Sequence, residues 1–279
     1  MMFSSVVPLV QLQLKYLSNL GLQLIKWNAK RHQFFSTGSN QRNIRLVLGT
    51  LFVIVLNGFY TIFLQRHHAR SLVQLFTAAF ATALAITSTI LCKPDPFVYL
   101  MNMTIQFEAK CFPKLESAPL WKIDYMSGWR LALWFCCWST LLVSIVGPSC
   151  VIAITLYQPN LPPFLGSMLP IWENDTPCAA VMHMAVSLYQ AWTLYVLGIA
   201  FSLAVGHIFF GILLSVTMYI TSLTRTLGWN SSSKISKIGI QYYKQVEILI
   251  SHLNYCFRPV VLPAILLYAI AVNILNGQI

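Results

Sequence analysis

Three aromatic side chains stand three residues apart within a long uncharged stretch of the chain. Tyr189, Trp192 and Tyr195 have the spacing that places side chains roughly along one side of a helix. Gln190 and Thr193 lie between them. A pocket for an apolar ligand needs aromatic walls and a few polar groups, so these residues predict a binding site for a small organic molecule. The alternative is an aromatic belt at a membrane interface combined with helix packing.

Two further side chains are ligand-binding candidates. Trp138, on another uncharged stretch, has the same two interpretations. His207 is the only ionisable group deep in an uncharged span, and an ionisable group in that setting is a functional hypothesis by default. The alternative is a neutral imidazole that bonds a neighbouring helix.

The sequence lacks the residue patterns that catalysis, metal binding or ion coupling would require. No arrangement of a nucleophile and a base is visible, so we expect no enzyme. His67 and His68 are adjacent, but no further metal ligand is near them in the sequence, and no CxxC pair or His–Cys cluster occurs. We therefore expect no metal and no cofactor. No acidic residue falls within a predicted span, so a proton-coupled or ion-coupled relay has no obvious carrier.

The composition indicates a membrane protein. The chain is 57% hydrophobic and only 9% charged, whereas soluble domains carry about 25% charged residues. The net charge of +11 fits the crowding of Lys and Arg in cytoplasmic loops. No basic run is interleaved with stacking aromatics, so we expect no binding of nucleic acid.

The charge-free stretches predict an all-α fold, a polytopic transmembrane helical bundle of about five spans. The expected spans are 46–65, 71–92, 131–157, 186–222 and 259–276. Residues 46–279 would form this transmembrane domain, and residues 1–45 a cytoplasmic amino-terminal segment. The uncharged stretch 177–224 could also hold two short helices, but these would place an acidic loop and a basic segment on the same side of the membrane, so one long helix is preferred.

Charge also predicts the orientation. The basic segments 1–45, 93–130 and 225–258 alternate with the short turn 66–70 and with a loop that carries an acidic pair near Asn174. An inside amino terminus places all three basic segments in the cytoplasm. Asn174 would then be outside, as part of a glycosylation sequon weakened by the following Pro177. We expect a multi-pass protein of the cell membrane.

The inner segments have patterns of their own. Six apolar residues at helical spacing predict an amphipathic helix in 1–45, lying on the membrane surface or packed on the bundle, namely Val10, Leu14, Leu17, Leu20, Leu24 and Trp27. Residues 32–40 read as a linker. In 93–130 a helix is expected to start near Pro94 and Pro96. A second amphipathic helix precedes the last span, with Val246, Leu249, Ile250, Leu253 and Phe257 on its apolar face.

This layout resembles the arthropod gustatory and odorant receptor superfamily. The tract from Tyr242 to Leu249, continuing to Phe257-Arg258-Pro259, is similar to the inner segment before the fifth span in divergent gustatory receptor-like proteins. The resemblance implies a seven-span protein that assembles as a tetrameric ligand-gated cation channel. It also implies an outer pocket for small organic molecules and a seventh span that lines the pore.

The chain departs from that family at its end. It stops after the fifth predicted span, so no pore residue can be carried over. The expectation is a chemosensory receptor subunit that senses tastants or odorants, present as an incomplete chain. Its partners would be the bilayer, a small organic ligand and other subunits of a homo- or hetero-oligomer. The alternatives are a non-functional membrane fragment, or a transporter, which predicts internal repeats and charges within spans.

Overall fold

The computed structural model describes residues 2–38, 41–64, 70–116, 123–158, 161–168, 177–229 and 233–259, and then 261, 263–264, 266 and 268–270. This part of the chain is almost entirely helical, which confirms the all-α class. A two-stranded sheet is the exception. The elements are α1 (Phe3–Asn19), β1 (Ile25–Asn28), β2 (Gln33–Ser36), α2 (Gln41–Leu64), α3 (Arg70–Cys92), α4 (Asp95–Glu116), α5 (Ile123–Tyr157), the 3-10 turn η1 (Leu165–Met168), α6 (Pro177–Phe201), the π-helical segment η3 (Ser202–Phe210), α7 (Gly211–Trp229) and α8 (Ser233–Phe257).

Four helices in the described ranges are long and apolar enough to cross a membrane. They cover Gln41–Phe63, Leu72–Cys92, Gly128–Tyr157 and Pro177–Thr221. The expected fifth span, 259–276, lies largely outside the described residues. In the first three helices only 22–33% of the most apolar window is buried. Apolar faces of that extent are not left in water, so the structure supports a membrane protein.

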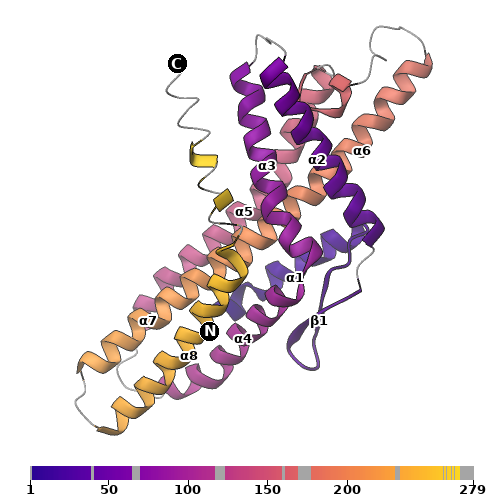
Figure 1. The fold of residues 1–279 in the computed structure, drawn as a ribbon. Coiled ribbons are helices and arrows are strands. Elements are labelled where there is room, and N and C mark those ends of the chain that lie inside the picture. Colours follow the sequence, from indigo (N-terminus) through magenta and orange to yellow (C-terminus); the bar gives the residue numbers. More distant parts are fainter. Residues whose placement is uncertain are drawn as a thin grey trace.

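The fourth of these helices is the axis of the bundle. It runs without interruption through α6, η3 and α7, and Figure 1 shows α6 and α7 as one continuous rod. Of its most apolar window, 67% is buried. The preference for one long helix is therefore confirmed, although the helix begins at Pro177 rather than near residue 186. Proline suits the first turn of a helix because the amide there has no intrahelical partner.

Glycines let the neighbouring helices approach closely. A Cβ added to Gly206 would meet the Thr140 side chain of α5 at 2.3 Å, and one added to Gly58 of α2 would meet Thr77 Oγ1 of α3 at 2.0 Å. A Cβ on Gly198 would lie 2.8 Å from the carbonyl oxygen of Ser144. Small residues have this role in membrane bundles, where tight packing replaces the hydrophobic effect.

The amino-terminal segment differs from its sequence pattern. Helix α1 ends at Asn19, and Gly21 then takes a positive φ of 87°. The chain continues into an antiparallel hairpin, with Trp27 paired to Phe34, where residues 32–40 were expected to be a linker. That expectation was wrong because a distant residue completes the hairpin. The Asn102 side chain of α4 accepts from the Phe34 amide and donates to the Phe34 carbonyl, both at 2.7 Å.

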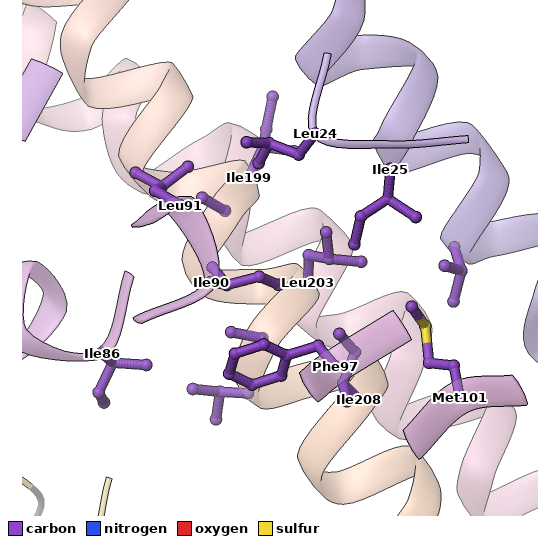
Figure 2. Close-up of a cluster of buried hydrophobic side chains, with 14 of the residues drawn as sticks. Leu24, Ile25, Ile86, Ile90, Leu91, Phe97, Met101, Ile199, Leu203 and Ile208 are labelled. Atoms are coloured by element: carbon purple, nitrogen blue, oxygen red, sulfur yellow. The ribbon is translucent and has the colours of Figure 1, made fainter. Parts of the chain in front are cut away.

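Helix α1 packs within the bundle. Met2, Phe3 and Val6 are fully buried, and α1 contacts α4, α5, α6, η3 and α7. Of the two interpretations of its amphipathic pattern, packing on the bundle is the one that the structure contains. Figure 2 shows apolar side chains that join the turn after α1 and the start of β1 to α3, α4, α6 and η3. The labelled members are Leu24, Ile25, Ile86, Ile90, Leu91, Phe97, Met101, Ile199, Leu203 and Ile208.

Helices α4 and α8 pair beside this core. The start of α4 at Asp95 agrees with the expected start near Pro94 and Pro96. The predicted amphipathic face of α8 is confirmed, since Val246, Leu249, Leu253 and Phe257 are all buried. The rings of Phe97 and Phe257 meet edge to face with centroids 5.4 Å apart, which fixes the beginning of α4 against the end of α8.

Candidate functional site

A buried carboxylate joins three helices at the amino end of α1. Glu108 of α4 is fully buried. It accepts hydrogen bonds from the backbone amides of Met2 at 2.7 Å, Phe3 at 2.6 Å and Ser4 at 2.8 Å. The hydroxyl groups of Ser4 and of Tyr219, on α7, donate to it as well. Five donors therefore surround a group that has only acceptors when ionised.

The start of α1 explains this arrangement. The first amides of a helix have no intrahelical acceptor, and Met2 provides no side-chain cap. The end of a helix that carries these amides also bears a partial positive charge, which favours a carboxylate. Glu108 supplies the missing cap from another helix, so one side chain fixes the position of α1 relative to α4 and α7.

The sequence contained a signal for Glu108 that was missed. Phe97, Met101, Thr104 and Glu108 follow at i, i+4, i+7 and i+11, so Glu108 continues the buried stripe of α4. The sequence pattern places residues 93–130 in a cytoplasmic segment outside the predicted spans, so an acidic residue there does not stand out as a buried group. Glu108 lies outside the four long apolar helices, yet it is inside the bundle.

A second buried polar group lies where α1 crosses η3. Gln13 and His207 are fully buried. The Gln13 amide nitrogen donates to Ser202 Oγ at 2.7 Å, and His207 Nδ1 is 3.3 Å from the carbonyl oxygen of Ser202. Gln13 Oε1 and His207 Nε2 have no hydrogen-bond partner among the described residues. Ser202 thus links α1 to the imidazole, and two polar atoms remain open in an apolar interior.

The structure brings Tyr189 and Trp192 together. Their ring centroids are 5.8 Å apart with an interplanar angle of 33°. Tyr189 shares a hydrogen bond of 2.6 Å with Thr50 Oγ1 of α2, and the Trp192 indole donates to the carbonyl oxygen of Leu20 at 3.0 Å. Both polar groups therefore hold α6 against α2 and against the turn that follows α1.

Tyr195 and Trp138 lie apart from that pair. The Tyr195 hydroxyl shares a hydrogen bond of 2.7 Å with Ser149 Oγ of α5. Trp138, also on α5, is 51% exposed. Each step of three residues turns a helix by about 300°, so Tyr189 and Tyr195 point roughly 120° apart. The spacing keeps neighbouring pairs together but does not bring all three rings to one wall.

Gln190 is more enclosed than the aromatic residues beside it. It is 3% exposed, and its Oε1 accepts from the Leu165 amide at 3.1 Å. The neighbouring Phe164 ring lies edge to face with Phe76, at 5.5 Å, and with Phe80, at 6.0 Å. Gln190 Nε2 has no partner within the described ranges. An open amide donor next to an aromatic cluster has the composition of a small-molecule site.

Asn174, the candidate glycosylation residue, lies outside the described residues. Comparison of the chain with protein-family models, with curated proteins and with solved structures found no match. The family resemblance therefore stays a prediction, and the functional proposal below depends on the geometry of the chain itself.

Proposed function

We propose that the chain is a multi-pass cell-membrane protein of about five spans with its amino terminus in the cytoplasm, and that it acts as a chemosensory receptor subunit. It would belong to the ligand-gated cation channel type suggested by the resemblance, bind small organic molecules, and work as an oligomer, a tetramer by that resemblance. The order of the helices supports this proposal. A long fourth apolar helix follows three shorter ones, and the amphipathic α8 comes after it.

The observation that carries the proposal is the open donor of Gln190. A buried polar group without a partner costs about 1–3 kcal/mol, so a ligand that supplies an acceptor gains affinity there. Phe76, Phe80 and Phe164 offer the aromatic surface that would enclose the rest of the molecule. The ligand class is therefore an apolar compound of small size with one carbonyl or ether oxygen.

The same helix provides a route from this site to the other end of the bundle. Gln190 lies on α6 and Tyr219 on α7 of one continuous rod, and Tyr219 bonds Glu108. A ligand that shifts α6 would change the fit of α7 against α1 and α4. Binding affects such an equilibrium only by its difference in affinity for the two arrangements.

The test is a screen of small esters, ketones and ethers against the full chain. Thermal unfolding of the purified protein in detergent reports binding, and whole-cell current reports gating. A compound that stabilises the wild-type protein should lose its effect on Gln190→Leu, which keeps the size but removes the donor. Gln241→Leu, at an exposed position of α8, should respond like wild type. Equal responses of wild type and Gln190→Leu to every active compound would place the ligand elsewhere.

Glu108 favours a second candidate, a small-molecule transporter. An acidic group inside a bundle is the kind of residue that carries a coupling proton or cation. A transporter would accumulate labelled substrate in vesicles along a pH or sodium gradient, and Glu108→Gln would remove that coupling. The receptor proposal predicts current without accumulation, so one vesicle experiment separates the two.

A further inference from the structure

A basic cleft opens where α3, α4 and α8 meet. Its volume is about 1060 Å³, and it is lined by the last turn of α3, the first turn of α4, the end of α8 and the two prolines that follow, Pro259 and Pro263. None of Gln190, Phe76, Phe80 and Phe164 lines this cleft, although Phe76 and Phe80 lie further along α3. The cleft is therefore distinct from the proposed small-molecule site.

Each of the two walls of the cleft carries one cationic side chain. Lys93 comes directly after α3, and Arg258 directly after α8; both are exposed. Among the described residues, no acidic side chain lines the cleft and neither cation forms an ion pair. Side chains of Ser251, Asn254 and Tyr255 add hydrogen-bond donors on the α8 wall. This combination fits an anion with several oxygen atoms, since Arg and Lys are the usual ligands of phosphate.

The floor of the cleft is apolar. Phe97 and Cys256 are buried there, with Pro96 beside them. The cleft thus combines a cationic rim with an apolar base, so that one amphiphilic molecule could contact both.

The position of the cleft relative to the membrane indicates which class of anion binds there. The candidate span Leu72–Cys92 ends one residue before Lys93. Lys93 therefore lies at the height of lipid headgroups, where Lys and Arg between helices bind anionic heads. A soluble anion has no apolar part that could contact the apolar floor.

We propose that this cleft binds the headgroup of an anionic phospholipid. Lys93 and Arg258 contact the phosphate oxygens from the two walls, the donors of α8 complete the contacts, and the glycerol and the beginning of the acyl chains lie over Phe97. The lipid would hold the end of α3 to the end of α8, two segments separated by more than 150 residues in the chain.

The experiment titrates the purified full chain in neutral detergent with dioctanoyl phosphatidylinositol 4-phosphate and measures bound lipid by native mass spectrometry. Removing both cations in Lys93→Gln/Arg258→Gln should weaken binding by about thirtyfold, since each basic residue near an anionic head contributes about fivefold. The matched control is Lys30→Gln/Arg31→Gln, which removes the same charges from exposed positions in the turn of the β-hairpin and should bind like wild type.

Two further arms identify the source of the anion. Dioctanoyl phosphatidylcholine should bind far more weakly than the anionic lipid, and inositol 1,4-bisphosphate and inorganic phosphate, which lack acyl chains, should not compete at millimolar concentration. The proposal is overturned if the cleft variant binds the anionic lipid as wild type does, if both double variants lose the same affinity, or if the soluble phosphates compete fully. Affinity of the wild-type chain should also fall with added salt, a measurement that does not depend on the folding of any variant.

Discussion

Replacement of Glu108 by alanine should release the amino-terminal helix from the bundle. The change removes the carboxylate that accepts from the buried amides of Met2 and Phe3 and from the buried Tyr219 hydroxyl. A buried donor left unsatisfied costs about 1–3 kcal/mol, and removal of one partner from a buried charged contact typically costs about 3–5 kcal/mol. Because α1 can relax and admit water, the costs do not add in full, and we expect the free energy that holds α1 in the bundle to fall by roughly 3–5 kcal/mol.

Hydrogen exchange measured by mass spectrometry gives the direct readout. If that free energy goes into local opening, exchange at the first amides of α1 should accelerate by at least about a hundredfold. The melting temperature in detergent should fall by roughly 10 °C. Glu247→Ala, at an exposed position of α8, removes the same charge and should change neither quantity. Unchanged exchange in α1 of the Glu108→Ala protein would show that the carboxylate is not what holds the helix.

Three other outcomes are expected. Gly58→Ala should destabilise the α2–α3 pair by about 1–3 kcal/mol in thermal unfolding, because the new methyl would overlap the Thr77 side chain; Thr77→Ala in the same chain should restore most of the loss, and a lack of rescue would exclude this overlap as the cause. Maleimide at neutral pH should label the exposed Cys92 but not Cys256, because burial raises the pKa of the Cys256 thiol to about 11 and keeps it protonated; fast labelling of Cys256 would contradict its burial. Asn102, in the sequon Asn102-Met103-Thr104, should carry no glycan after expression in eukaryotic cells, because the proposed orientation keeps residues 93–130 in the cytoplasm and both ends of the Asn102 amide are bonded to Phe34; a glycosidase-sensitive mass shift abolished by Asn102→Gln would refute this.

Hydropathy and periodicity were sufficient for the elements that depend on local pattern. The long apolar helices and the amphipathic face of α8 through Val246, Leu249 and Leu253 were found this way. The charge rule correctly favoured one long helix over two, and Gly198 and Gly206 within it serve contacts with α5. Each of these features depends only on the local sequence of one segment, so it can be predicted from the sequence alone.

The features that were missed depend on partners far away in the chain. The hairpin needs Asn102, some 70 residues beyond it, and the role of Glu108 becomes visible only when the start of α1 is placed next to it. The aromatic site shows a related limit. Residue spacing predicted that Tyr189 and Trp192 lie together. It could not predict the hydrogen-bond partner of each polar group, which comes from a neighbouring helix, as Ser149 does for the Tyr195 hydroxyl.

The π-helical segment η3 has a mechanical consequence for the long helix. It divides the rod into a half that carries Gln190 and a half that carries Tyr219, and all of its residues from Ser202 to Ile208 are buried. The i→i+5 hydrogen bonds of a π-helical segment accommodate a surplus residue within an otherwise α-helical pattern. Moving that surplus residue along the rod turns the stretch it passes through by about 100° about its own axis and advances it by about 1.5 Å. In this way the two halves of the rod can change their register against the neighbouring helices while the helix stays unbroken.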